Sequence, residues 1–547
     1  MPRAIGRGRR WSGLVLAGLA LGVAQAQPVA PPTPGAIADT VNTRTLPPLA
    51  TPPEVLFSRP GAAPRRATTQ RFLVSGFAFT GHTVFPEALL RRLVEPYLDL
   101  QLTLEELDRV ADRVTAFYRS RGYTVARAVV PAQRVADGLV TIQVIEGRLE
   151  AARFKGASRY GADFLNPWLE PLVHSGGTGP VVNDAALEHQ LLLLNDLPGL
   201  SARATLVPGE RFGGTIVEVE TQEKHVGLAV GLNANGTDET GRERADVGVE
   251  LNNPLRLGDQ LQLRAIQSTD GLFRWRRAGY SVALGRQGAR LALSSTLTQY
   301  RLGGEFEALQ IAGRVRSGDA TLSYPFTRSR AQNVIGALQW RVTRSEQTFG
   351  GKPLPGTQLP VAVASVYANW IRPDASAHAL SLALTTNILD RGRDEAVGDY
   401  RRFAKVDADW TYLTGAARNV DFFFRGRVAR ATAPLPDLER ISIGGADSVR
   451  GYQPSQLRGD AGYQATFELR RQFMMVNLPG YVSGFAELGG VQNRGFMGWD
   501  RMASVGVGWT HYYGRQGQMK AEIAKPLLDI QGRAQPVRVW VGTQVSF

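Results

Sequence analysis

With 547 residues, the chain can hold several domains, and its 43% hydrophobic content includes no apolar blocks that would indicate a bundle of membrane helices. It has no cysteine, which excludes disulfides and thiolate metal sites. The formal net charge is +14, but there is no dense basic block, so arginines that line a wet channel or face anionic lipid headgroups explain the charge better than nucleic acid does.

Residues 1–26 are typical of a secretory signal. Four arginines precede an apolar core from Gly13 to Val23, and the small-residue sequence Ala24–Ala26 provides a cleavage site. An amphipathic cytosolic helix is the alternative, but the core is apolar on every side. We therefore expect a mature chain that starts at Gln27 and lies outside the cytoplasm.

Residues 27–70 are rich in Pro, Ala and Thr, and include three Pro-Pro pairs. Proline interrupts helices, so this segment predicts a mobile linker without a long helix. A short apolar stretch, Glu54–Phe57, has no partner that the sequence identifies.

Residues 71–148 have the mixed pattern of a small α/β module. After a first strand and helix, Thr103 and Glu106 have the spacing of a capping box and open an apolar-faced helix that Gly122 closes. Tyr123–Val130 and Leu139–Ile145 then follow as strands. The predicted order is strand, helix, helix, strand, strand.

Residues 149–224 repeat this order. A strand at Ala151–Lys155 precedes helices at Ala162–Leu172 and Asn183–Leu194, and two strands at 202–207 and 215–221 complete the module. The sequence thus predicts an internal duplication at the level of element order.

From residue 225 to 547, helical periodicity gives way to short alternating runs separated by turn clusters. In the last run, the even-numbered residues from Arg538 oppose an apolar face that ends on the aromatic Phe547. Such a strand suits a closed barrel in lipid. If each strand with its connection takes roughly 20 residues, this region holds about 16 antiparallel strands. A large β-sandwich is the alternative, but it has no need of the terminal aromatic residue.

One segment of the barrel region, Gly444–Pro454, breaks the strand pattern. Two glycines and a proline predict a structured loop, and Gly451 lets the guanidinium of Arg450 project from a tight backbone toward a carboxylate. Glu487 is available as that carboxylate, because alternation along Tyr481–Gly489 places it on the lumen face of an otherwise apolar-out strand.

These residues resemble signatures of the Omp85 superfamily. The sequence Val449-Arg450-Gly451-Tyr452 is similar to the V-R-G-Y/F motif of the long sixth extracellular loop. Phe485-Ala486-Glu487-Leu488-Gly489 is similar to the F-x-D-x-G strand motif whose acid pairs with the loop arginine, with Glu487 in place of Asp.

The two modules resemble POTRA domains, and the combination is most similar to the TpsB transporters, the hemolysin secretion and activation group. This resemblance implies two-partner (type V) secretion. POTRA-like domains in the periplasm of a Gram-negative bacterium would capture an unfolded exoprotein, such as a hemolysin or adhesin, and pass it through an outer-membrane barrel to the cell surface. Members often carry a plug helix near the N-terminus, where this chain predicts no long helix.

The resemblance further implies a monomer surrounded by outer-membrane lipids, with Phe547 acting as a signal to the barrel-assembly machinery. An assembly factor of the same superfamily and a passive pore remain as alternatives. The pair Arg450 and Glu487 could gate the pore or only brace it. The histidines are scattered, and no G-x-S-x-G or P-loop motif is present. The sequence therefore predicts no enzymatic activity, no cofactor site and no metal site.

Overall fold

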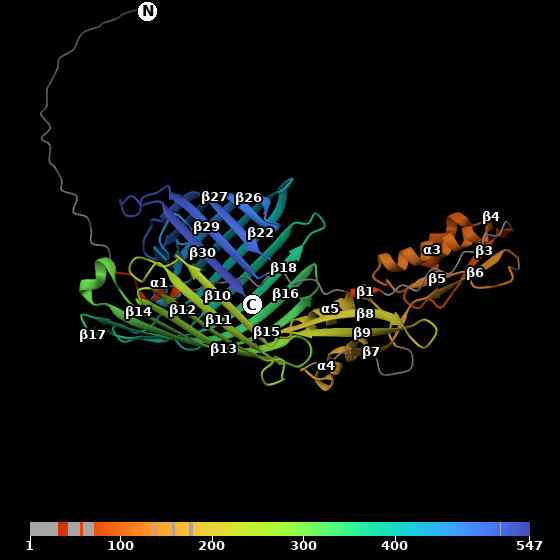
Figure 1. Cartoon of the computed structure of the whole chain (residues 1–547), viewed down its shortest axis with the longest axis horizontal. Coiled ribbons are helices and arrows are strands. Elements are labelled where there is room, and N and C mark those ends of the chain that lie inside the picture. The colour runs from red at the N-terminus through yellow and green to blue at the C-terminus, as the bar shows by residue number, and fades with distance from the viewer. Residues whose placement is uncertain are drawn as a thin grey trace, which may run out of the picture. The chain divides into compact units, whose positions relative to one another are not determined.

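The computed structural model describes residues 31–41, 55–57, 70–135, 137–155, 159–173, 179–514 and 516–547 (Figure 1). The predicted signal at residues 1–26 lies outside these residues, as does most of the predicted linker. No helix in the described ranges is both long and apolar enough to cross a membrane.

Two short elements form within the predicted linker. Helix α1, Pro34–Asp39, starts at an N-cap Thr33 with proline in its first turn, and strand β1, Val55–Phe57, pairs in parallel with a strand of the second module. A six-residue helix is too short to be stable alone, so its packing partners must hold it. These two stretches are ordered within the predicted mobile linker, and neither forms a long helix.

The first module follows the predicted order with two differences: the first strand is broken, and an unpredicted short strand, β4, lies between the two helices and pairs with β2. Ser75 interrupts the first predicted strand, because its N–H and hydroxyl bond to Gly138 and Asp137. The capping box of Thr103 and Glu106 is confirmed. The elements are β2 Arg71–Val74, β3 Gly76–Thr80, α2 Glu87–Val94, η1 Glu95–Tyr97, β4 Leu100–Thr103, α3 Leu104–Ser120, β5 Arg127–Val129 and β6 Leu139–Ile145.

The core of this module lies between α2, α3 and a sheet of order β3-β6-β5. Beside the core, the carboxylate of Glu146 is buried at 4% exposure. It accepts hydrogen bonds from the N–H groups of Thr83 (2.6 Å) and Val84 (2.8 Å), the Thr83 hydroxyl, and the Tyr118 hydroxyl (2.9 Å). Glu146 thereby fixes the loop before α2 to the end of β6.

The second module repeats the predicted order and has its own core around Leu165, Trp168 and Leu191. Its sheet has the order β1-β8-β9-β7, so the linker strand β1 forms one edge. Asn183 caps the second long helix as its position predicts. The elements are β7 Arg148–Lys155, α4 Ala162–Leu169, η2 Glu170–Leu172, α5 Asp184–Asn195, β8 Leu200–Pro208 and β9 Gly214–Glu223.

Residues from Val226 onward form a closed antiparallel barrel of 16 strands, as predicted (Figure 1). The last strand pairs with the first, and Phe547 exchanges two backbone hydrogen bonds with Leu228 (2.7 and 3.2 Å). The barrel strands are β10 Val226–Asn233, β11 Arg244–Asn252, β12 Gln260–Ser268, β13 Phe273–Leu284, β14 Ala289–Arg301, β15 Ala312–Arg328, β16 Gln332–Phe349, β18 Thr357–Ile371, β19 Ala377–Thr386, β22 Ala404–Ala417, β23 Val420–Ala431, β26 Ala461–Met475, β27 Leu478–Gln492, β28 Asp500–Tyr513, β29 Gly517–Pro526 and β30 Arg538–Ser546.

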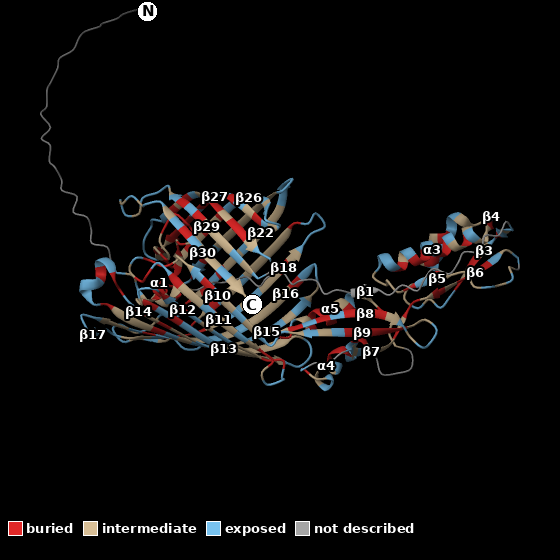
Figure 2. Cartoon of the chain, viewed as in Figure 1, coloured by how far each residue is buried: buried red, intermediate tan, exposed pale blue. Residues whose placement is uncertain are grey.

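Along many of these strands, exposed residues alternate with intermediate or buried ones (Figure 2). The outward set is mainly apolar, with Leu338 at 63% and Val507 at 60% exposure, whereas the inward set is rich in charged and polar side chains. An apolar outer face and a polar inner face are what a barrel in lipid requires.

Helix α1 packs against the inner wall of this barrel. Ile37 is 1% exposed among inward aromatic residues that include Phe273, Trp275 and Tyr300. Arg458, in the short strand β25 Leu457–Gly459, bonds to Asp39 at the end of the helix (2.9 Å) and to Thr33 at its start (3.0 Å). One guanidinium thus holds both ends of α1, which supplies the tertiary support that six residues need.

Candidate functional site: a loop held inside the barrel

The candidate site lies in the long connection between β23 and β26. This connection contains the one-turn helix η4 Asp437–Glu439 and a two-stranded ribbon formed by β24 Ile441–Ile443 and β25. The loop at the tip of the ribbon starts with Gly444 and Gly445, whose φ angles of 106° and 102° lie in a region that favours glycine. The N–H of Gly445 then bonds to the carbonyl of Tyr452 (3.1 Å), so the loop closes on itself.

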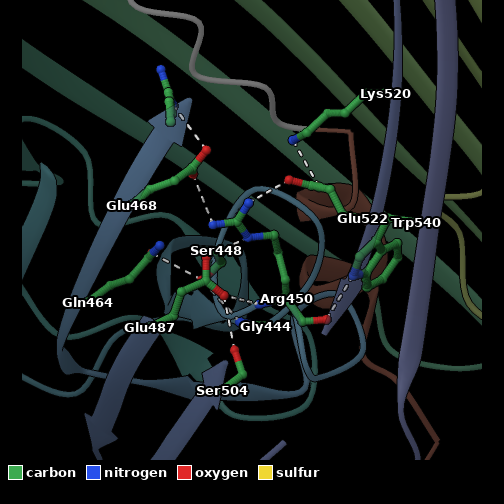
Figure 3. Close-up of polar contacts among 11 residues, drawn as sticks. Gly444, Ser448, Arg450, Gln464, Glu468, Glu487, Ser504, Lys520, Glu522 and Trp540 are labelled. Atoms are coloured by element: carbon green, nitrogen blue, oxygen red, sulfur yellow. Dashed lines mark hydrogen bonds and ion pairs between the residues drawn. The ribbon is translucent and has the colours of Figure 1, made fainter. Parts of the chain in front are cut away.

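Arg450 projects from this loop into a cluster of three carboxylates on the barrel wall (Figure 3). Its backbone N–H and its Nε both donate to Glu487, at 2.6 and 2.7 Å. Its two terminal nitrogens donate to Glu522 of β29 (2.5 Å) and to Glu468 of β26 (3.3 Å). The guanidinium is therefore bound on every side by a different strand.

The environment of this cluster is closed to solvent. Arg450 and Glu487 are each 4% exposed, and the guanidinium carbon lies 3.3 Å from the ring centroid of Phe485. This contact between the cation and the aromatic face stabilises Arg450 in addition to its ion pairs. Removal of the cation would leave three buried acids facing one another, which is the costly way to break a buried ion pair.

Two further cationic side chains pair with two of these acids. Arg470 donates to Glu468 (3.0 Å), and Lys520 lies 2.9 Å from Glu522. The Ser504 hydroxyl donates to Glu487 (3.0 Å). The cluster is thus a network of three acids and three bases that connects the loop to β26, β27, β28 and β29.

The neighbours of Arg450 in the predicted motif fix the backbone of the loop. Gly451 lies so close to the wall that an added Cβ would come within 2.8 Å of the Ser504 side chain and 3.0 Å of the Pro526 backbone. Tyr452 is fully buried, and its hydroxyl lies within hydrogen-bonding distance of the carbonyls of Ala503 (3.0 Å) and Leu528 (2.8 Å). Each motif residue therefore has a distinct contact with the barrel.

The outer residues of the two motifs also meet. Val449 is fully buried in a cluster with Ile443 and Tyr452, and a Cβ added at Gly489 would lie 3.2 Å from the Val449 side chain. The structure thus brings together all seven residues that the two sequence motifs single out. Phe547 lies elsewhere, at the C-terminal end of β30 next to β10, and is 58% exposed.

Several participants were not identified from the sequence, among them Glu468, Glu522 and Trp540. Glu468 and Glu522 occupy inward positions on their strands, as Glu487 does, so the parity that identified Glu487 could have found them too. Trp540 is 4% exposed, and its indole N–H donates to the carbonyl of Arg450 (2.7 Å, Figure 3). Its position on the face opposite the lipid-facing valines was the available signal.

Beside this network the lumen contains a cavity of about 680 Å³. Opposite charges pair around its wall. Arg425 of β23 pairs with Asp409 of β22 at 2.7 Å, and Lys405 of β22 pairs with Glu439 of η4 at 3.0 Å. The cavity is lined by α1, η4, the loop tip and the polar inner faces of the strands. Such a wall offers hydrogen-bonding groups to the lumen, with apolar side chains such as Leu438 and Ile441 among them.

The described part of the chain contains no group of three or more His, Asp or Glu side chains with the spacing of a metal site. The three acids around Arg450 are occupied by cationic side chains. The arrangement fixes the loop to the barrel wall.

Comparison with known proteins identifies this architecture. Residues 213–511 match the haemolysin secretion/activation protein family ShlB/FhaC/HecB, and residues 72–147 match the ShlB-type POTRA domain. The chain belongs to the haemolysin secretion/activation family. It is a two-partner secretion transporter, as the resemblance of its sequence motifs implies.

The similar proteins align with most of this chain. The heme/hemopexin transporter protein HuxB of Haemophilus influenzae (strain 86-028NP) is 23% identical over 84% of both chains. The hemolysin transporter protein ShlB of Serratia marcescens is 24% identical over 84% of this chain and 83% of ShlB. The structure of CdiB from Escherichia coli superposes with a TM-score of 0.67 at 21% identity, covering 89% of this chain and 93% of CdiB, which shows a shared fold.

Proposed function

We propose that this transporter binds one unfolded partner protein in the periplasm through its two modules and conducts it through the barrel to the cell surface. The observation that carries this proposal is the combination of a closed barrel with a polar, ion-paired lumen and two N-terminal modules with sheet edges. Residues 1–26 would direct export of the chain itself, and Phe547 would serve as the signal for barrel assembly.

The sheet edges of the modules offer the first binding step. β5 is an edge of the sheet in the first module and β7 an edge of the sheet in the second. An extended polypeptide can add to such an edge through main-chain hydrogen bonds, while side-chain pockets select the sequence. At the other edge of the second module, β1 already lies against β8, so a partner segment would compete with the chain's own linker for that position.

Passage requires the lumen to be cleared. Helix α1 and the loop around Arg450 both lie against the inner wall, and both are held by guanidinium groups that bridge carboxylates. We infer that α1 leaves the lumen during transport, because it is only six residues long and depends on tertiary contacts: the ion pairs of Arg458 with Asp39 and Asp437, and the packing of Ile37. The loop is fixed by more contacts, and we propose that it braces the open barrel.

The apolar outer face and polar inner face of the barrel indicate how the chain would lie relative to the membrane. Lipids of the outer membrane would surround the apolar outer face, with the modules in the periplasm and the loop between β23 and β26 toward the cell surface. A single chain closes its own barrel by pairing β10 with β30, which is consistent with a monomer.

Deletion of the transporter in its native host tests the proposal. We expect one large protein to disappear from the medium and to return when the full chain is supplied. A broad loss of outer-membrane proteins would instead indicate an assembly factor. Loss of small-solute uptake with an unchanged set of secreted proteins would indicate a passive pore.

A further inference from the structure

A cluster of arginines faces outward from the barrel wall on β13, β15 and β16. Residues of the same parity on these strands include Leu322 (45% exposed), Leu338 (63%) and Trp340 (38%), which belong to the apolar outer face. Residues of the other parity point inward, as Trp275 and Val315 do where they pack against α1. The outward cluster, called here the arginine rows, consists of Arg274, Arg276, Arg314, Arg316 and Arg344.

The strand register places these side chains in two adjacent rows. Arg276 lies opposite Leu297 of β14, which lies opposite Arg316, which lies opposite Arg344. In the next row Arg274 and Arg314 flank Gln299. All five are exposed except Arg314, which is half-buried.

The charges in these rows are not balanced by the protein. Among residues 179–514, all of which the structure describes, none forms an ion pair with the five arginines, and Arg344 instead donates to Gln358 (2.8 Å). Glu346, which lies opposite Arg314, is the one acid within the rows themselves. Like charges directly opposite on neighbouring strands, as at Arg316 and Arg344, destabilise a sheet unless an anion lies between them.

The rows lie where the apolar outer face ends, at the end of the barrel away from the modules. On β16 the outward sequence runs from Leu338, Trp340 and Val342 to Arg344. At the opposite end of β15, Arg328 pairs with Asp196 of the second module (2.6 Å). A molecule bound here would therefore meet cations with one part and a continuous apolar wall with the other.

We propose that the arginine rows bind the phosphate groups of a phosphorylated glycolipid of the outer leaflet, whose acyl chains lie on the apolar wall below. Guanidinium groups are suited to phosphate because they donate paired hydrogen bonds and stay charged. The adjoining apolar wall is what selects a lipid over a free phosphate ion. This inference rests on the outer-membrane placement of the barrel and not on which protein is exported.

Titration of the purified full chain in detergent micelles tests the proposal, with bis-phosphorylated lipid A as the probe and native mass spectrometry as the readout. We expect retention of lipid A, and a loss of affinity of roughly a hundredfold in the triple variant R276Q/R316Q/R344Q, since each basic residue contributes a similar step. The matched controls are R471Q, an outward arginine beyond Leu469 on β26, and R277Q, the inward neighbour of Arg276; both should bind as the parent does.

A second measurement needs no variant and so remains decisive if the triple variant fails to fold. Dephosphorylated lipid A and inorganic phosphate should each bind the parent chain at least about tenfold more weakly than lipid A. Equal binding of the dephosphorylated lipid, equal binding of inorganic phosphate, or unchanged affinity in a folded triple variant would each overturn the proposal. No partner protein is present in this titration, so its failure leaves the export proposal untouched.

Discussion

Two buried glutamates, Glu146 in the first module and Glu487 in the barrel, have the same structural role but different hydrogen-bonding partners. Each is 4% exposed and each fixes a loop to the end or face of a sheet. Glu146 is hydrogen-bonded by neutral N–H and O–H groups, and the nearest cation, Arg148, stays 4.0 Å away. Glu487 is bound by a buried guanidinium that two other acids share.

The difference shows what each loop can do. Neutral donors hold a carboxylate without creating a second buried charge, so the loop at Glu146 behaves as a fixed part of its module. The loop at Glu487 is held by a charge network whose members each depend on the others, so the loss of one member disturbs the rest. A network of this kind is suited to hold one conformation firmly or to change as a unit.

Replacement of Arg450 by alanine should have the largest effect, because it leaves Glu468, Glu487 and Glu522 facing one another. We expect a loss of about 3–5 kcal/mol of local stability and the loss of most of the secreted partner. The measurement is the amount of partner protein in the medium, compared between the parent and the variant at equal abundance of the barrel. R471A, at an exposed outward position on β26, is the control; normal secretion by R450A would contradict a role in transport.

Replacement of Gly451 by alanine tests whether the position of Arg450, and not only its charge, is needed. The added Cβ would meet the backbone of Pro526 at 3.0 Å, so the loop must shift, at a cost of about 1–3 kcal/mol. Secretion should fall, although less than in R450A. G484A is the control, because an added Cβ there meets nothing within 4 Å, and equal secretion by the two variants would contradict close docking of the loop.

Replacement of Glu146 by glutamine should cost about 1–3 kcal/mol within the first module and leave the barrel unchanged. Hydrogen exchange of residues 70–147 in the full chain would measure the loss. E95Q, at an exposed position of the same module, is the control. Faster exchange in the barrel would show that the two regions are coupled.

The same glutamate predicts a pH dependence. Burial opposes ionisation of Glu146, but the hydrogen bonds from Thr83, Val84 and Tyr118 together lower the pKa of this carboxyl below its ordinary value of 4.5. A lowered pKa in the folded state means that the stabilisation is complete above pH 4.5 and is lost as pH falls through the folded-state pKa. Exchange in the parent should therefore rise as pH falls below 4.5, after correction for intrinsic rates, and E146Q should lack this dependence.

Replacement of Glu487 by aspartate should have the smallest effect, because the charge is kept and the family motif has aspartate at this position. The carboxylate retracts by about 1.5 Å, which weakens one of its two contacts with Arg450 and costs about 1 kcal/mol. E487Q should reduce secretion more strongly than E487D. The opposite order would show that charge is not what holds Arg450.

Much of this architecture could be predicted from sequence, because alternation and capping are local properties. The 16 strands, the inward position of Glu487 and the capped helices of both modules follow from residue spacing alone. The motif residues could be named, and strand parity could also have marked Glu468 and Glu522 as inward acids. Their contacts with Arg450 could not be predicted, because those contacts depend on how the loop enters the lumen.

Helix α1 could not be predicted for a related reason. Six residues cannot form a stable helix without tertiary contacts. The contacts of α1 come from Arg458 and Asp437, about 400 residues away along the chain, and from the barrel side chains around Ile37. The local signals that do exist, Thr33 as N-cap and Pro34 in the first turn, are common in linkers as well. Strand β1 is likewise defined by its pairing with β8 and not by its own three residues.

Cross-linking inside the lumen tests the central claim most directly, and the absence of cysteine from the chain makes single-cysteine variants clean. Thr411 lines the lumen cavity, whereas Leu338 lies on the apolar outer face. With a partner protein stalled during export, T411C should cross-link to it and L338C should not. Cross-links from L338C alone, or none from T411C while export proceeds, would contradict passage through the barrel.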